Sequence, residues 1–155
     1  MKRSILFLGI LSLGMTTVSA KTSIKDFGQM VQKVSVEKEV TGIQFFKGTW
    51  AEAKEKAAKE SKLIFLDAYA EWCGPCKIMA KREFVKEDVG DFFNANFVNF
   101  KMDMEKDADG ERLSEKYGLK AYPTLFILDV NEEIKSKLVG ARKGKELIAF
   151  GKSVL

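Results

Sequence analysis

Residues 63–69, Leu-Ile-Phe-Leu-Asp-Ala-Tyr, form a nearly continuous apolar run in which polar and apolar residues do not alternate. This pattern predicts a β-strand that is buried on both faces, because a strand with one solvated face would carry polar residues at every second position. A sheet built around such a strand needs helices on both of its faces. The run therefore predicts an α/β domain with a central sheet.

Helical and strand patterns alternate along the rest of the chain. Residues 43–46 predict a short first strand, and Thr49 with Glu52 forms a capping-box signature that opens a helix to about Lys62. A mixed sheet follows, parallel in the first half of the chain and closed by a hairpin in the second, with helices on both faces. The further predicted elements are helices from the cysteine pair to residue 84 and over residues 88–94, 110–117 and 143–154, and strands over residues 97–103, 124–129 and 134–139.

The chain has only two cysteines, Cys73 and Cys76, which follow the buried run at the start of a predicted helix. Pro75 fits there, because the first helical turn does not use its missing N–H. A structural disulfide across so short a loop would constrain the unfolded chain very little. A zinc site would need ligands from a second molecule, because the chain has no histidine and no third cysteine. The spacing favours redox chemistry, with metal binding as the alternative.

Residues 1–20 have the three parts of a secretory signal peptide: the basic start Met-Lys-Arg, an apolar stretch and the small residues Val-Ser-Ala. The apolar stretch is shorter than the roughly 20 residues that span a bilayer, so cleavage after Ala20 is favoured over a membrane anchor. We therefore expect a periplasmic bacterial protein. Its predicted parts are an N-terminal extension at residues 21–41 and one domain at residues 42–155.

Charge and composition argue against a nucleic-acid-binding protein and against a fold that depends on a metal or a structural disulfide. The formal net charge is +4, from 26 Lys and Arg against 22 Asp and Glu, and both signs are interspersed along the chain. This distribution gives no footprint for nucleic acid. With 46% hydrophobic residues, the chain can build a core without a metal or a structural disulfide. We assign to this core the phenylalanines Phe84, Phe92, Phe93, Phe97 and Phe100.

Residues 67–77, Asp-Ala-Tyr-Ala-Glu-Trp-Cys-Gly-Pro-Cys-Lys, resemble the active-site segment of the thioredoxin family, and residues 122–124, Tyr-Pro-Thr, resemble its cis-proline loop. Residues 101–103 resemble the central strand of the family and Gly140 the glycine before its last helix, so the resemblance extends over residues 42–155. It implies a thioredoxin fold, which is an α/β fold with a central mixed sheet and helices on both faces.

The resemblance implies a thiol-disulfide oxidoreductase whose redox centre is the Cys73–Cys76 pair, with no other cofactor. Disulfide exchange needs a thiolate, which the N–H groups and partial positive charge at a helix N-terminus stabilise. We expect Cys73 to be the exposed nucleophile and Cys76 the resolving thiol. Asp67 would be costly to bury without a function, and burial should raise its pKa. The family implies that Asp67 is the general base for Cys76, with Lys101 either its charge partner or a lysine that simply reaches solvent.

Substrate binding is expected on both sides of the cysteine pair. Gly74 and Pro75 shape the turn, and the resemblance implies that they favour a reducing centre. Trp72 is expected either beside the active site or in the core. The resemblance also implies a cis bond before Pro123, which would hold the Tyr122 backbone beside the cysteines, where a substrate chain could add as a short β-like partner.

Two positions differ from the family pattern, and both bear on partner choice. Tyr69 stands where the family usually has tryptophan, and Tyr122 where it usually has isoleucine.

The main functional hypothesis is a reductase of disulfides in exported proteins that takes electrons from a membrane donor. An oxidant or an isomerase would use the same residues, because the direction of exchange depends on the relative stability of the two redox states. A third hypothesis is a binding module that carries copper or zinc on the cysteine pair. We expect a monomer with no nucleic-acid partner and no stable membrane insertion after leader cleavage.

Overall fold

The computed structural model describes residues 41–155, which contain a four-stranded sheet with the order β2-β1-β3-β4. The strands are β1 (Leu63–Tyr69), β2 (Phe97–Asp103), β3 (Thr124–Leu128) and β4 (Ile134–Val139). β1 pairs in parallel with β2 and antiparallel with β3, and β3 pairs antiparallel with β4. The predicted signal peptide and residues 21–40 of the predicted extension lie outside the described residues.

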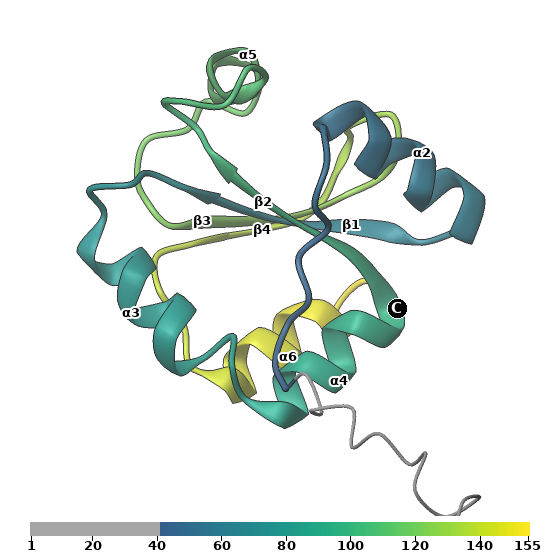
Figure 1. Ribbon diagram of the computed structural model, residues 1–155, viewed down its shortest axis with the longest axis vertical. Coiled ribbons are helices and arrows are strands. Elements are labelled where there is room, and N and C mark those ends of the chain that lie inside the picture. Colours follow the sequence, from purple (N-terminus) through teal and green to yellow (C-terminus); the bar gives the residue numbers. More distant parts are fainter. Residues whose placement is uncertain (1–40) are drawn as a thin grey trace, which may run out of the picture. The chain divides into compact units, whose positions relative to one another are not determined.

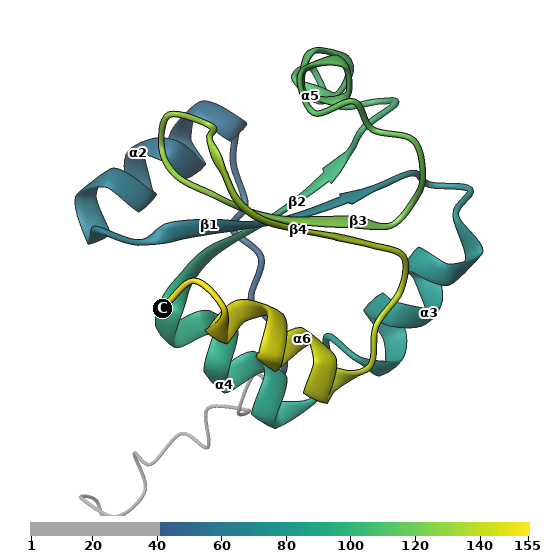
Figure 2. The same ribbon diagram turned by 180° about the vertical axis from the view of Figure 1, so that it is seen from behind.

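Helices cover both faces of the sheet (Figure 1, Figure 2), which confirms the predicted fold class. One face is covered by α2 and α5, and the other by α3, α4 and α6. These helices are α2 (Trp50–Glu60), α3 (Gly74–Arg82), α4 (Glu87–Asn96), α5 (Gly110–Lys116) and α6 (Gly144–Lys152). Across residues 41–155, none of the helices combines the length and apolar character that a membrane crossing requires.

The two faces of β1 contribute to two separate hydrophobic cores. Successive side chains of a strand point to opposite faces, so Ile64 and Leu66 pack with α2 and α5, whereas Phe65 packs with α3, α4 and α6. Asp67 and Tyr69 follow Phe65 on that second face. Of the phenylalanines predicted for the core, Phe84, Phe93, Phe97 and Phe100 are buried, and Phe92 is half-buried against the second core.

The predicted first strand at residues 43–46 does not form, so this prediction is wrong. The Phe46 N–H donates to the Asn99 carbonyl of β2 at 2.8 Å, but side-chain amides satisfy the neighbouring backbone groups. The Gln44 N–H donates to Asn94 Oδ1 at 2.8 Å, and the Asn99 side chain donates to the Gln44 carbonyl at 3.3 Å. Because these amides take the place of ladder bonds, β2 remains the edge strand of the described sheet.

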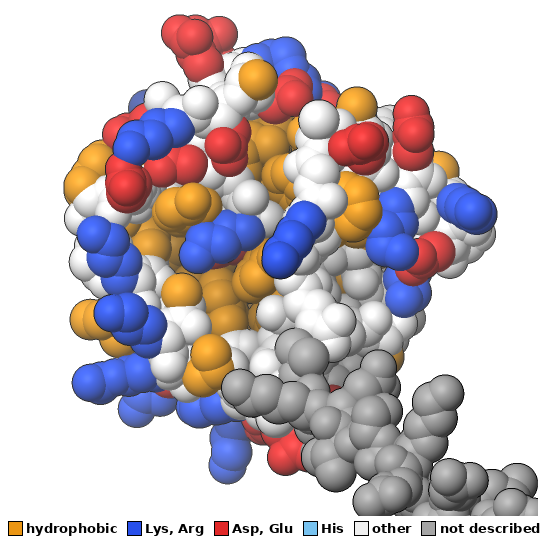
Figure 3. Space-filling model, in the orientation of Figure 1, with side chains coloured by type: hydrophobic (Ala, Val, Ile, Leu, Met, Phe, Trp, Pro, Cys, Tyr) orange, Lys and Arg blue, Asp and Glu red, His pale blue; other side chains and the backbone are white. Residues whose placement is uncertain are grey.

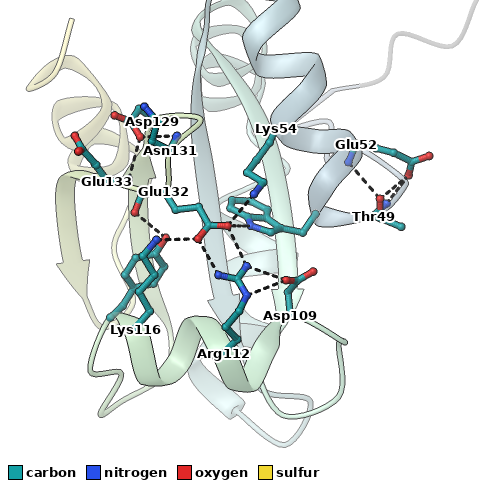
Figure 4. Close-up of polar contacts among 12 residues, drawn as sticks. Thr49, Glu52, Lys54, Asp109, Arg112, Lys116, Asp129, Asn131, Glu132 and Glu133 are labelled. Atoms are coloured by element: carbon teal, nitrogen blue, oxygen red, sulfur yellow. Dashed lines mark hydrogen bonds and ion pairs between the residues drawn. The ribbon is translucent and has the colours of Figure 1, made fainter.

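Glu132 links both helices of one face to the turn between β3 and β4 (Figure 4). Its buried carboxylate accepts hydrogen bonds from Trp50 (2.8 Å), Lys54 (3.0 Å), Arg112 (2.8 Å) and Lys116 (2.8 Å). The donors come in pairs spaced one helical turn apart, on α2 and on α5. The Arg112 guanidinium, followed by the other donors, holds the pKa of Glu132 well below its ordinary value.

Substitution of Glu132 tests this link. Glu132→Gln should lower the free energy of unfolding by about 1–3 kcal/mol at neutral pH, because three cationic side chains would then face a neutral group. The folded pKa of Glu132 is depressed, so its contribution is present above the ordinary pKa of 4.5 and is lost as the pH falls through the folded value. Urea unfolding at neutral and at acidic pH should therefore show a difference between variant and wild type that shrinks in acid.

Glu133→Gln is the matched control, because the Glu133 side chain is next in sequence but 68% exposed. It should change stability little. A loss equal to that of Glu132→Gln would mean that local charge, and not the buried network, determines the effect.

Candidate active site

Cys73 and Cys76 form a disulfide at the N-terminus of α3, with their Cα atoms 5.3 Å apart. Cys73 is the N-cap residue of the helix, and its Sγ accepts a hydrogen bond from the Cys76 N–H at 3.2 Å. Pro75 lies in the first turn, where no N–H is needed. In the reduced protein the same N–H and the helix dipole would stabilise a Cys73 thiolate.

Both cysteines are buried in this disulfide form, with 2% of Cys73 and 3% of Cys76 exposed. The expectation that Cys73 is exposed is therefore wrong for the oxidised protein. Ala70 is buried in the same cluster, and the half-buried rings of Tyr69 and Tyr122 pack against it. A partner thiol that reduces this disulfide must consequently approach the sulfur atoms between these side chains.

Trp72 lies on the rim of the site and not in the core. Its side chain is 68% exposed and stands edge to face with Tyr122, with ring centres 5.7 Å apart. The indole N–H donates to Glu105 Oε2 at 2.8 Å. Glu105 was not predicted as a site residue, and no local pattern indicates it because the two residues are 33 positions apart.

The bond between Tyr122 and Pro123 is cis, as the family resemblance implied. The loop is held by the Thr124 hydroxyl, which donates to the Ala121 carbonyl at 2.7 Å, and by the Gly140 N–H, which donates to the Pro123 carbonyl at 2.8 Å. Tyr122 packs against the cysteine cluster. The loop and the cysteine pair thus lie side by side, although they are far apart in the sequence.

Asp103, at the end of β2, holds two segments of the rim together. Its buried carboxylate accepts hydrogen bonds from the Glu71 N–H and the Glu105 N–H, each at 3.0 Å. Lys106 forms an ion pair with the Glu71 side chain across the same junction. Sequence reasoning missed the role of Asp103, although a carboxylate at the end of a strand parallel to the one before the cysteines is a usable signal.

Asp67 is buried in β1 with 1% of its surface exposed, and within residues 41–155 its Oδ1 has no hydrogen-bond partner. Burial raises the pKa of Asp67 to about 7, and the nearby Lys101 ammonium opposes this shift. Lys101 Nζ lies 3.8 Å from Asp67 Oδ2, and the two residues are partners in the β1–β2 register. The predicted pairing of these residues is therefore present, and at this pKa the carboxyl can both accept and release a proton near neutral pH.

A hollow of about 170 Å³ opens beside Cys76 and is also lined by Tyr69, Glu71 and Lys101. Within residues 41–155, no three His, Cys, Asp or Glu side chains gather as candidate metal ligands. The described site consists of a disulfide, a buried carboxyl group and an aromatic rim.

The sheet order, the cysteine pair at a helix N-terminus and the adjacent cis-proline loop define a thiol-disulfide oxidoreductase with a thioredoxin fold. The family described as Thioredoxin matches residues 44–153, and the chain belongs to this family.

Individual relatives agree with this assignment. The chain is 36% identical over 98 residues to a Thioredoxin H-type of Fagopyrum esculentum. The matched residues are 63% of this chain and 78% of the relative. It is 32% identical over 104 residues to the Thiol:disulfide interchange protein DsbD of Colwellia psychrerythraea, covering 64% of this chain and 17% of that protein. A solution structure of a candidate disulphide-isomerase from Bacteroides thetaiotaomicron superposes with a TM-score of 0.64 at 44% identity, covering 72% of this chain and 91% of the other.

Replacing Asp67 tests the cost of burying its carboxyl group. The raised pKa means that the folded oxidised protein binds this proton more tightly than the unfolded chain does, so the group lowers stability as the pH rises from its ordinary pKa of 3.8 to about 7. Asn does not ionise. The free energy of unfolding of Asp67→Asn, compared with that of the wild type, should therefore increase by on the order of 2–4 kcal/mol as the pH rises from mildly acidic to mildly alkaline. Urea unfolding without reductant measures this difference.

Asp129→Asn provides a control of opposite sign, because Lys135 and backbone N–H groups lower the pKa of Asp129. That variant should lose stability relative to wild type as the pH rises through the acidic range. A stability difference for Asp67→Asn that stays constant with pH would contradict the raised pKa.

Proposed function

We propose that this protein reduces disulfide bonds of exported proteins in the bacterial periplasm and is itself reduced again by a membrane electron donor. The observation that carries this proposal is the Cys73–Cys76 disulfide at the N-terminus of α3, beside the loop of Pro123. Residues 1–20, with the order of a signal peptide, support the location. The cysteine pair is the whole redox centre, with no separate cofactor.

The reaction begins with the reduced protein. The Cys73 thiolate attacks a substrate disulfide, forms a mixed disulfide and releases one substrate sulfur as a thiolate, which takes up a proton. Asp67 then accepts the proton of Cys76, and the Cys76 thiolate attacks Cys73 Sγ. The second substrate sulfur leaves as a thiolate and takes up the proton that Asp67 accepted, so the substrate gains two electrons and the protein ends in the disulfide form.

The rim supports a peptide partner. Trp72 and Tyr122 present aromatic surface next to the sulfur atoms, and the backbone before Pro123 can pair with an extended substrate segment. Tyr122 packs against the cysteine cluster and the Trp72 ring packs against Tyr122, so a bound segment would contact these rings while its own disulfide reaches Cys73. The name of the DsbD relative, Thiol:disulfide interchange protein, gives the same reaction type.

Two cysteine variants test the reaction and its location together. With the full chain expressed in a bacterium, Cys76→Ser should accumulate mixed disulfides with exported proteins in the periplasmic fraction, because Cys73 can attack but the bond is not resolved. Cys73→Ser should form none, and both variants should lose insulin reduction in vitro by at least about 100-fold. Adducts confined to the cytoplasm would reject the proposed location, and wild-type activity in Cys73→Ser would reject the mechanism.

Disulfide isomerisation is the second candidate function, favoured by the 44% identity to the Bacteroides thetaiotaomicron structure. The equilibrium reduction potential of the Cys73–Cys76 pair, measured in glutathione or dithiothreitol buffers, distinguishes disulfide reduction from isomerisation. We expect a value near the roughly −270 mV of thioredoxin, as the Gly74-Pro75 dipeptide suggests. A value near −180 mV, about that of protein disulfide isomerase, would instead favour isomerisation.

A further inference from the structure

Tyr69, Lys101 and Asp67 meet on one face of the sheet. Asp67 and Tyr69 are two residues apart in β1, so their side chains leave the strand on the same side. The Lys101 Nζ lies 4.4 Å from the centre of the Tyr69 ring and 3.8 Å from Asp67 Oδ2. One ammonium group therefore contacts an aromatic face and a buried carboxylate at the same time.

Other carboxylates lie near this ammonium group, and of these Glu71 already forms an ion pair with Lys106. The Lys101 side chain is 30% exposed and lines two neighbouring hollows, one of about 170 Å³ with Glu71 on its wall and one of about 440 Å³ with Asp107. Figure 3 shows the side of the molecule with the β2 edge, where apolar surface is hollowed and basic side chains lie over it. A long, strongly hydrated lysine would turn towards exposed carboxylates unless a contact held it. The Tyr69 ring provides such a contact.

We propose that Tyr69 is a positioning residue, whose ring holds the ammonium group of Lys101 against Asp67 and away from Glu71 and Asp107. Through Lys101, Tyr69 sets how readily the Asp67 carboxyl group exchanges its proton. The consequence for catalysis rests on the proposed function of Asp67 as the base for the resolving cysteine.

Among the described residues, Lys101 is the charged group that acts on the pKa of Asp67. The second neighbour of Asp67 in the sheet, Leu125 of β3, is apolar. Helix α3 brings the disulfide-bonded Cys76 to the adjoining hollow. The charged side chains that α3 contributes there, Lys77 and Lys81, are both exposed.

The ring of Tyr69, and not its hydroxyl group, performs the positioning. Burial, followed by nearby carboxylates, raises the pKa of the Tyr69 hydroxyl above its ordinary value of 10.0, so this group is neutral at physiological pH. Phenylalanine keeps the ring face and should therefore keep the position of Lys101. An aliphatic side chain at position 69 has no ring face and should therefore not hold Lys101 in place.

The test is a titration of the Asp67 carboxyl carbon by NMR in the oxidised full-length chain. Tyr69→Leu and Lys101→Met should each raise the pKa of Asp67 by about half a unit or more, because each removes the ammonium group that opposes the burial shift. The double variant should move the pKa no further than the larger single change, because both act through one contact. Tyr69→Phe is the matched control and should keep the wild-type pKa.

Three results would overturn the proposal: a wild-type pKa in Tyr69→Leu, an unshifted pKa in Lys101→Met, or shifts that add in the double variant. If Tyr69→Leu does not fold, Tyr69→Met removes the ring with a flexible apolar side chain and carries the same expectation. The pKa readout is independent of enzymatic activity. Absence of insulin reduction by the wild type would therefore reject the proposed function and leave the positioning role standing.

Discussion

The burial of β1 on both faces is the constraint on which the rest of the structure depends. β1 has hydrogen-bonded neighbours on both edges and a layer of helices on each face, so every side chain between its ends is excluded from water. This places Asp67 in a medium of low polarity and carries the chain directly into the loop that ends at Cys73. Helix α3, which begins at the cysteine pair, and the buried carboxyl group of Asp67 are thus positioned by the same strand.

Two buried carboxylates show how partners decide the state of an acid in such a medium. Glu132 is surrounded by donors from α2 and α5, and its pKa is depressed, so it is a charged structural link. Asp67 has one lysine at 3.8 Å and an oxygen that finds no hydrogen-bond partner in the described part of the chain, and its pKa is raised to about 7. The first arrangement stabilises one protonation state, whereas the second keeps both within reach near neutral pH, which suits proton transfer.

The rim of the site is built from segments that meet only in the folded domain. Asp103 joins the backbone of Glu71 to that of Glu105, and Glu105 in turn fixes the indole of Trp72. The exposed indole of Trp72 next to the disulfide is therefore held in place by hydrogen bonds between these segments. The cysteines themselves are almost completely covered.

The sequence by itself determined the parts that depend on near neighbours. The bounds of β1, β2 and β4, the Thr49–Glu52 capping box and the placement of the cysteine pair at a helix start all agree with expectation, because periodicity and capping are local properties. The tertiary structure decided the rest. Asn94 and Asn99 bind the backbone that was predicted to form a first strand, the Tyr122 ring packs against the cysteine cluster, and Glu105 holds Trp72. These contacts join residues that lie far apart in the chain, and their geometry is set by packing of whole elements, which no local pattern encodes.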